Sequence, residues 1–157
     1  MTQDNTESKK LLVVYHSQSG RNERLAYAAA AAATEEGVQI RLLRAMEASC
    51  KDLIWCDGVL LCTPENFGAL SGGIKDFLDR CFYPAIDRNL VRPYALMVCS
   101  GNDGSNAVRQ LEKIAKGMGL KPVAEPYVCH GRPNDAHLAA ARELGQALAA
   151  GLELGVF

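Results

Sequence analysis

The sequence predicts an α/β protein, a three-layer sandwich in which a five-stranded parallel sheet of order 2-1-3-4-5 is covered by helices on both faces. Three observations lead to this prediction. Apolar runs rich in β-branched residues alternate along the whole chain with stretches of helical periodicity. Several of these runs are apolar throughout, as is typical of strands buried on both faces. The length, 157 residues, is that of one ordinary domain.

Five segments are predicted to be strands. The first, "LLVVY", and the third and fourth, "GVLLCT" and "YALMVCS", are apolar enough to be buried on both faces. The second, "VQIRLL", alternates apolar and polar residues, which places it nearer an edge. The fifth, "KPVAEPYVCH", contains two prolines, which also favour an edge position. In chain order the ranges are 11–15, 38–43, 58–63, 94–100 and 121–130.

The helices are predicted between the strands. Residues 22–36 carry alanines that let a helix lie close against a sheet, and Gly37 ends this helix. A short, weak helical stretch follows near 46–54. The next helix carries Ile74, Phe77, Leu78 and Cys81 on one face, with Pro84 expected just past its end. A further helix, from Val108 to Met118, is closed by Gly119, and the last is expected from Asp135 to Ala150.

Composition limits the class of protein. We expect residues 1–10 to be a disordered polar tail and residues 11–157 to form a single domain. The charge is nearly balanced, with 17 basic and 18 acidic residues, and the absence of a basic block argues against nucleic acid. No apolar run reaches the length of a membrane span, and the polar start lacks the core of a secretory signal, so a cytoplasmic location is expected.

The six cysteines show no C-x-x-C spacing and are expected to be reduced core thiols; no metal site is predicted.

Three loops contain most of the candidate ligand-binding residues. Residues 16–22, 63–72 and 100–106 are rich in Gly, Ser, Asn and Thr, and they follow the first, third and fourth predicted strands. These strands are neighbours in a 2-1-3-4-5 sheet. In open α/β sheets, ligands bind beyond the carboxyl ends of strands, where the strand order reverses. The three loops are therefore expected to form one binding site.

The first loop has the features of a phosphate site. Ser17 and Ser19 offer hydroxyl donors, Gly20 lets the backbone turn its N–H groups inward, and Arg21 and Asn22 stand at the start of a helix. A helix N-terminus favours a phosphate through its free N–H groups and partial positive charge. The loop is neither a Walker loop nor a G-x-G-x-x-G turn. The alternative is a simple helix cap on a connector.

Two motifs resemble a known family. "YHSQSGRNERLA" resembles the phosphate loop of the flavodoxin-like superfamily, and "TPENFGALSGGIKDFLDR" (63–80) is similar to the second flavin loop of the NAD(P)H-dependent FMN reductase and flavodoxin-like oxidoreductase families. The resemblance implies a flavodoxin-like fold, bound FMN, and a homodimer or homotetramer. One departure is Asn22, which replaces the usual threonine of the phosphate loop; its side-chain amide can still donate a hydrogen bond.

The resemblance also implies a set of cofactor-binding residues. Those expected to hold the FMN phosphate are Ser17, Ser19, Gly20, Arg21 and Asn22. Those expected to border the isoalloxazine ring are Thr63, Pro64, Glu65, Asn66, Phe67 and Gly68. Those expected to close its pyrimidine side are Ser100, Gly101, Asn102, Asp103 and Gly104. Phe67 either packs on the ring or holds its own loop. Lys75, Asp79 and Arg80 are expected to form helix-surface ion pairs or a subunit contact.

The function implied is that of an NAD(P)H-dependent FMN oxidoreductase. NADH or NADPH would reduce the flavin, and a quinone, flavin or similar acceptor would then be reduced at the same place, in a ping-pong hydride transfer. No catalytic side chain is required, because the flavin carries the chemistry. One alternative is a flavodoxin-like single-electron carrier, which the near-neutral charge and the absence of aromatic residues in the third loop disfavour. A second alternative is an interaction module without a cofactor. It is suggested by Asn22, which stands where the phosphate loop of the family usually has threonine.

Overall fold

The computed structural model describes residues 7–157. The predicted polar tail is only partly covered, because residues 1–6 lie outside the described residues. The first strand, β1, spans Lys10–Tyr15. Residue Lys9, just before it, is tied to the domain: its backbone N–H donates to a carboxylate oxygen of Glu153 at 3.0 Å, and its carbonyl accepts from the N–H of Gln39 at 2.8 Å. The ordered chain therefore begins ahead of residue 11.

The described residues form a seven-stranded sheet whose main path runs β2-β1-β3-β5-β6. Along this path every neighbouring pair is parallel. The strand order is that of the predicted 2-1-3-4-5 sheet, so the predicted fold class is confirmed. The strands after β1 are β2 Gln39–Arg44, β3 Gly58–Asn66, β4 Ala69–Leu70, β5 Arg92–Ser100, β6 Leu120–Pro122 and β7 Tyr127–His130.

The sheet differs from the predicted five strands in two places. The predicted fifth strand, 121–130, is two strands, β6 and β7, both parallel to β5. The interruption contains Pro126, which has no N–H to donate to a strand ladder and restricts the residue before it. The other addition is β4, a short strand that folds back antiparallel on the end of β3. It lies in the second predicted ligand loop.

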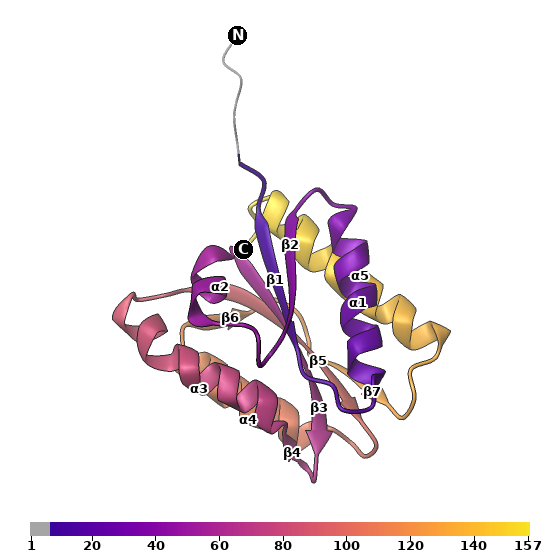
Figure 1. Ribbon diagram of the computed structural model, residues 1–157. Helices are drawn as coiled ribbons and strands as arrows, with labels where there is room; N and C mark the ends of the chain where they lie inside the picture. Colours follow the sequence, from indigo (N-terminus) through magenta and orange to yellow (C-terminus); the bar gives the residue numbers. More distant parts are fainter. Residues whose placement is uncertain (1–6) are drawn as a thin grey trace.

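Helices cover both faces of the sheet, as Figure 1 shows. α1 and α5 pack on one face, and α2, α3 and α4 pack on the other. Alternate residues of β1 serve the two cores: Leu11 and Val13 face α1 and α5, whereas Leu12 and Val14 face the other three helices. The helices span α1 Arg21–Thr34, α2 Cys50–Trp55, α3 Gly72–Asp87, α4 Ser105–Gly117 and α5 Asp135–Glu153.

One helix boundary corrects the prediction. Pro84 lies inside α3, which continues to Asp87, and not just past its end. Proline removes the N–H that would bond to the carbonyl of Arg80. The helix continues because its apolar face does not end there: Cys81 and Ala85 are both fully buried against the core. Tertiary packing therefore outweighs the local effect of the proline.

The pairing of α1 with α5 follows from small residues. A Cβ atom on Gly145 of α5 would lie 2.2 Å from the carbonyl oxygen of Ala29 in α1, so the two backbones approach too closely for any other residue at position 145. The alanines of α1 thus let it lie close to a helix as well as to the sheet. Among residues 7–157, no helix combines the length and the apolar character that crossing a bilayer would require.

Candidate functional site

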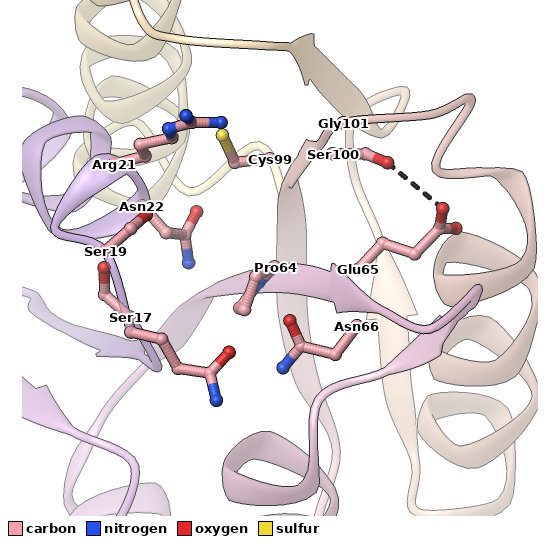
Figure 2. A pocket seen from close by; sticks show the side chains of 11 residues that line it. Ser17, Ser19, Arg21, Asn22, Pro64, Glu65, Asn66, Cys99, Ser100 and Gly101 are labelled. Carbon is pink, nitrogen blue, oxygen red and sulfur yellow. Dashed lines mark hydrogen bonds between the residues drawn. The ribbon is translucent and has the colours of Figure 1, made fainter.

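The three predicted ligand loops meet at the carboxyl edge of the sheet, around one open cavity of about 170 Å³ (Figure 2). Its lining comes from the loop after β1, from the ends of β3 and β5, and from the first turn of α1. The lining residues are Ser17, Gln18, Ser19, Arg21, Asn22, Pro64, Glu65, Asn66, Cys99, Ser100 and Gly101. Enclosed ligand pockets usually measure roughly 300–1,000 Å³. This cavity therefore encloses only part of a flavin-sized ligand.

The phosphate loop leaves the first turn of α1 open. Gly20, the residue before the helix, has a φ of 85° and no side chain that caps the helix. Its N–H donates to the hydroxyl oxygen of Ser17 at 3.1 Å, which shapes the turn and leaves the Ser17 hydroxyl proton free to donate elsewhere. The amides at the start of a helix need partners and carry partial positive charge. The loop can therefore bind an anion.

Asn22 differs from the sequence expectation. Its side-chain nitrogen donates to the carbonyl oxygen of His16 at 2.9 Å, so one of its two N–H groups is already used within the loop. Its Oδ1 atom is buried and has no hydrogen-bond partner among the described residues, although the side chain is only 1% exposed. Figure 2 shows this amide directed into the cavity between the phosphate loop and Pro64. The unpaired atom is an acceptor, which suits a ligand hydroxyl better than a phosphate oxygen.

The second ligand loop is a tight β-hairpin. Glu65 and Asn66 of β3 pair with Leu70 and Ala69 of β4. The two residues of the turn, Phe67 and Gly68, have φ values of 51° and 69°. Positive φ at both positions is the geometry of a type I′ turn.

Three predicted residues of this loop, Thr63, Phe67 and Gly68, do not line the cavity. Thr63 is fully buried, and its hydroxyl bonds to the Ser71 hydroxyl at 3.0 Å and the Pro64 carbonyl at 2.9 Å, so it fixes the base of the hairpin. The Phe67 side chain is fully exposed at the tip and does not hold its own loop by packing. A non-glycine residue in the left-handed region costs about 1–2 kcal/mol of backbone energy, and the exposed Phe67 ring makes no packing contact with the described residues that offsets this cost.

The third loop is held against the hairpin by hydrogen bonds. The Ser100 hydroxyl donates to a Glu65 carboxylate oxygen at 3.1 Å, and the backbone N–H of Asn102 donates to the Ser100 hydroxyl at 3.0 Å. On the far side, the Leu70 N–H donates to the side-chain oxygen of Gln110 in α4 at 2.8 Å. Glu65 therefore couples the second loop to the third, and α4 supports both.

The sequence analysis found most of the cavity. The predicted residues that line it are Ser17, Ser19, Arg21, Asn22, Pro64, Glu65, Asn66, Ser100 and Gly101. The predicted residues that do not line it are Gly20, Thr63, Phe67, Gly68, Asn102, Asp103 and Gly104. Gln18 and Cys99 also line the cavity and were not predicted. Gln18 lies between the two predicted serines, and Cys99 directly precedes Ser100 at the end of β5, so their positions in the sequence offered a signal.

Residues around the cavity have structural roles. His130 stands at the rim, with its Nδ1 atom 2.6 Å from the Asn102 carbonyl oxygen. The expected surface ion pairs of α3 are present: Lys75 contacts Asp79 at 2.7 Å, and Arg80 contacts Asp76 at 2.9 Å. Arg80 also donates to the carbonyl oxygens of residues 45 and 48, which fixes α3 to the segment before α2.

The titratable groups near the cavity are not activated nucleophiles. Burial raises the pKa of the Cys99 thiol, and burial next to Cys99 raises the pKa of Cys129 to about 12. Thiolate chemistry at neutral pH is therefore disfavoured. Burial lowers the pKa of His16, and the positive charge of Arg44 lowers it further, so this imidazole is neutral at pH 7. Within residues 7–157, no group of three or more His, Cys, Asp or Glu side chains gathers as a metal site would require.

Residues 44–135, more than half of the chain, match the protein family described as NADPH-dependent FMN reductase. The chain belongs to this family. The matched segment includes the hairpin and the third loop, so the resemblance of the 63–80 motif is confirmed. The family description names FMN and NADPH, in agreement with the cofactor and the nicotinamide donor expected from the sequence.

Two curated proteins are similar over part of their length. A flavodoxin of Aquifex aeolicus is 35% identical over 71 residues, which are 45% of this chain and 38% of that protein. An NADPH azoreductase of Bacillus sp. is 32% identical over 77 residues, 48% of this chain and 42% of that protein. The matched regions thus span about two fifths of these relatives. Among solved structures, an archaeal flavodoxin superposes with a TM-score of 0.82 at 17% identity, covering 91% of this chain and 98% of that one, which shows the shared fold.

The residues present fit the FMN of this reductase family. An open helix N-terminus with two serine hydroxyls and Arg21 suits a phosphate, and the unpaired buried oxygen of Asn22 suits a hydroxyl of the flavin's ribityl chain. The hairpin and the third loop offer small or polar groups and backbone at the place where a ring would lie. The donors and acceptors of the cavity are therefore compatible with FMN.

Proposed function

We propose that this chain is an FMN-dependent oxidoreductase that transfers reducing equivalents from NADPH or NADH to a small-molecule acceptor. The observation that carries the proposal is the cavity itself, where the phosphate loop, the hairpin and the third loop meet with an unpaired buried acceptor inside. Bound FMN supplies the hydride chemistry, and the protein supplies binding, orientation and control of water.

Each loop is assigned one task. Ser17, Ser19 and Arg21, with the first amides of α1, bind the phosphate. Asn22 accepts a hydrogen bond from the ribityl chain through Oδ1. Glu65, held by the Ser100 hydroxyl, keeps the hairpin and the third loop at a fixed separation, which sets the width of the space for a ring.

An open ring face favours the enzyme over the electron carrier. No aromatic side chain of residues 7–157 lines the cavity, and Phe67, the aromatic residue of the hairpin, is fully exposed at the tip. The third loop at 101–103 is exposed and carries only small or polar side chains. A planar donor or acceptor could therefore stack in turn on the same face, which agrees with a ping-pong exchange. Quinones, free flavins and azo compounds are the acceptor classes to test, the last because of the azoreductase relative.

The second candidate is a single-electron carrier, which the flavodoxin relative favours. The two functions differ in one experiment. The purified protein is loaded with FMN, and its absorption spectrum is followed anaerobically after addition of NADPH or NADH. Bleaching of the flavin band, and its return on addition of a quinone or azo dye, supports the oxidoreductase. A flavin that neither nicotinamide reduces, but that a ferredoxin-type reductase reduces by one electron, supports the carrier instead.

We also propose that the chain is a homodimer or homotetramer. Tyr83 and Ile86 of α3 and Val91 after it are large apolar side chains that a monomer would leave exposed, and so are Leu154 and Val156 near the C-terminus. Such exposed apolar groups mark candidate protein contacts. Light scattering at micromolar concentration is expected to give at least the mass of a dimer; a monomer would contradict this proposal.

A further inference from the structure

A second cavity lies beside the flavin site, between the start of α1 and the loop that precedes α5. Its volume is about 540 Å³, and it shares Ser19 and Arg21 with the flavin cavity, so the two cavities are neighbours. We call it the arginine cavity. Its lining residues are Ser19, Gly20, Arg21, Glu23, Arg24, Arg132 and Pro133.

The arginine cavity carries positive charge that the described residues do not neutralise. The side chains of Arg21, Arg24 and Arg132 make no ion pair or hydrogen bond with any of residues 7–157. The single acidic residue of the lining, Glu23, is engaged elsewhere, with its carboxylate 2.7 Å from the guanidinium of Arg44. Guanidinium groups bind phosphate oxygens with paired, charge-assisted hydrogen bonds. The cavity therefore has the charge and the donors for phosphate.

The backbone that presents these arginines is fixed. Gly131, just before Arg132, donates its N–H to the Ser100 carbonyl at 2.8 Å, and Pro133, just after it, is buried. Asn134 then caps α5 by accepting from the His137 N–H at 2.9 Å. Arg132 thus stands between two anchored neighbours, and Arg24 stands on the first turns of α1. The backbone at both positions is already ordered, so it loses less entropy when a ligand binds.

We propose that the arginine cavity binds phosphate groups of an adenine dinucleotide, separately from the flavin phosphate. This inference rests on the proposed function only in naming NADPH as the expected source. FMN has a single phosphate, for which the open turn of α1 with Ser17, Ser19 and Arg21 already provides donors. Arg24 and Arg132 are then available for the adenosine diphosphate part that NADPH and FAD share. Because the two cavities share Ser19 and Arg21, a dinucleotide bound in the arginine cavity would lie next to the flavin cavity.

The test measures binding without turnover. The FMN-loaded protein is titrated calorimetrically with adenosine 5′-diphosphate, the part that NADPH and FAD share, and with 2′,5′-adenosine diphosphate, which carries the 2′-phosphate of NADPH. The affinity of the flavin-free protein for FMN and FAD is measured by fluorescence. The variants are Arg24→Ala and Arg132→Ala, with Arg142→Ala as a matched control on the exposed part of α5. Each of the first two substitutions is expected to weaken binding of 2′,5′-adenosine diphosphate roughly tenfold. The affinity for FMN should change less than about threefold, and Arg142→Ala should have no effect.

The outcomes separate this inference from the proposed function. Failure to bind either adenosine diphosphate, or binding that neither arginine affects, would overturn it. A loss of FMN affinity of about tenfold in Arg24→Ala or Arg132→Ala would also overturn it, because these side chains would then serve the flavin phosphate. Tighter binding of FAD than of FMN that depends on both arginines would support the cavity with FAD as the source. Arginine-dependent nucleotide binding in a protein that never oxidises NADPH would keep the inference and reject the proposed function.

Discussion

Substituting Asn22 with leucine tests the contact that distinguishes this site. Among residues 7–157 the buried Oδ1 has no partner, and an unpaired buried acceptor costs about 1–3 kcal/mol. Leucine has nearly the same shape and removes this cost. It also removes the hydrogen bond to the His16 carbonyl, seen at 2.9 Å, which is a loss of similar size. The free energy of unfolding of the flavin-free protein is therefore expected to change by no more than about 1 kcal/mol.

The effect on flavin binding should be larger. If a ribityl hydroxyl donates to Oδ1, binding relieves the cost in the wild type but not in Asn22→Leu. A difference of about 1–3 kcal/mol corresponds to a rise in Kd of roughly 5- to 150-fold. Fluorescence titration of the flavin-free protein measures this Kd, and urea denaturation measures stability. Riboflavin is the internal control, because it has the hydroxyls but no phosphate, so its Kd should rise by the same factor as that of FMN.

Two results would refute this reasoning. A Kd for FMN within about twofold of the wild type would mean that Oδ1 does not contact the flavin. A large rise for FMN with none for riboflavin would place Asn22 on the phosphate, as the sequence alone suggested.

Three further predictions concern the rest of the site. The double variant Ser17→Ala, Ser19→Ala should lose about 1.5–3 kcal/mol of FMN binding per hydroxyl yet stay folded by circular dichroism; unchanged affinity would reject the phosphate role. Asn102→Trp should lower turnover with NADPH and a quinone while FMN stays bound, and the wild type should give parallel double-reciprocal lines, whereas intersecting lines would exclude a shared face. Because burial and Arg44 lower the pKa of His16 in the folded state, the unfolded state binds more protons below pH 6.5, so stability should fall as pH falls through that value. In His16→Gln the urea midpoint should depend less on pH in this range. If its pH dependence is unchanged, groups other than His16 cause the loss of stability.

The sequence predicted the fold because the signals for strands and helices are local. Continuous apolar runs marked β1, β3 and β5, and the alternation with helical stretches left few topologies once right-handed crossovers were required. It erred where tertiary packing competes with local preference. Pro84 was predicted to follow the helix end. α3 continues through it because Cys81 before it and Ala85 after it are both buried.

The sequence also determined which loops form the site. Polar, glycine-containing segments after three neighbouring strands must meet at one edge of a parallel sheet, and that rule brought Ser17, Pro64 and Ser100 together across more than eighty residues of chain. The direction of each side chain, however, is not encoded in such a pattern. Thr63 and Phe67 belong to the predicted loop, but one faces the base of the hairpin and the other faces solvent.

Only the tertiary structure decided what remains available to a ligand. The sequence shows that Asn22 can donate and accept, but it cannot show that the carbonyl of His16 takes a donor and leaves the acceptor unpaired. Nor can it show that Arg132, more than a hundred residues after Arg24, lines the same cavity, or that Glu23 is drawn away by Arg44. Hydrogen-bond saturation and charge pairing depend on contacts between distant segments, and these exist only once the sheet has brought its loops to one edge.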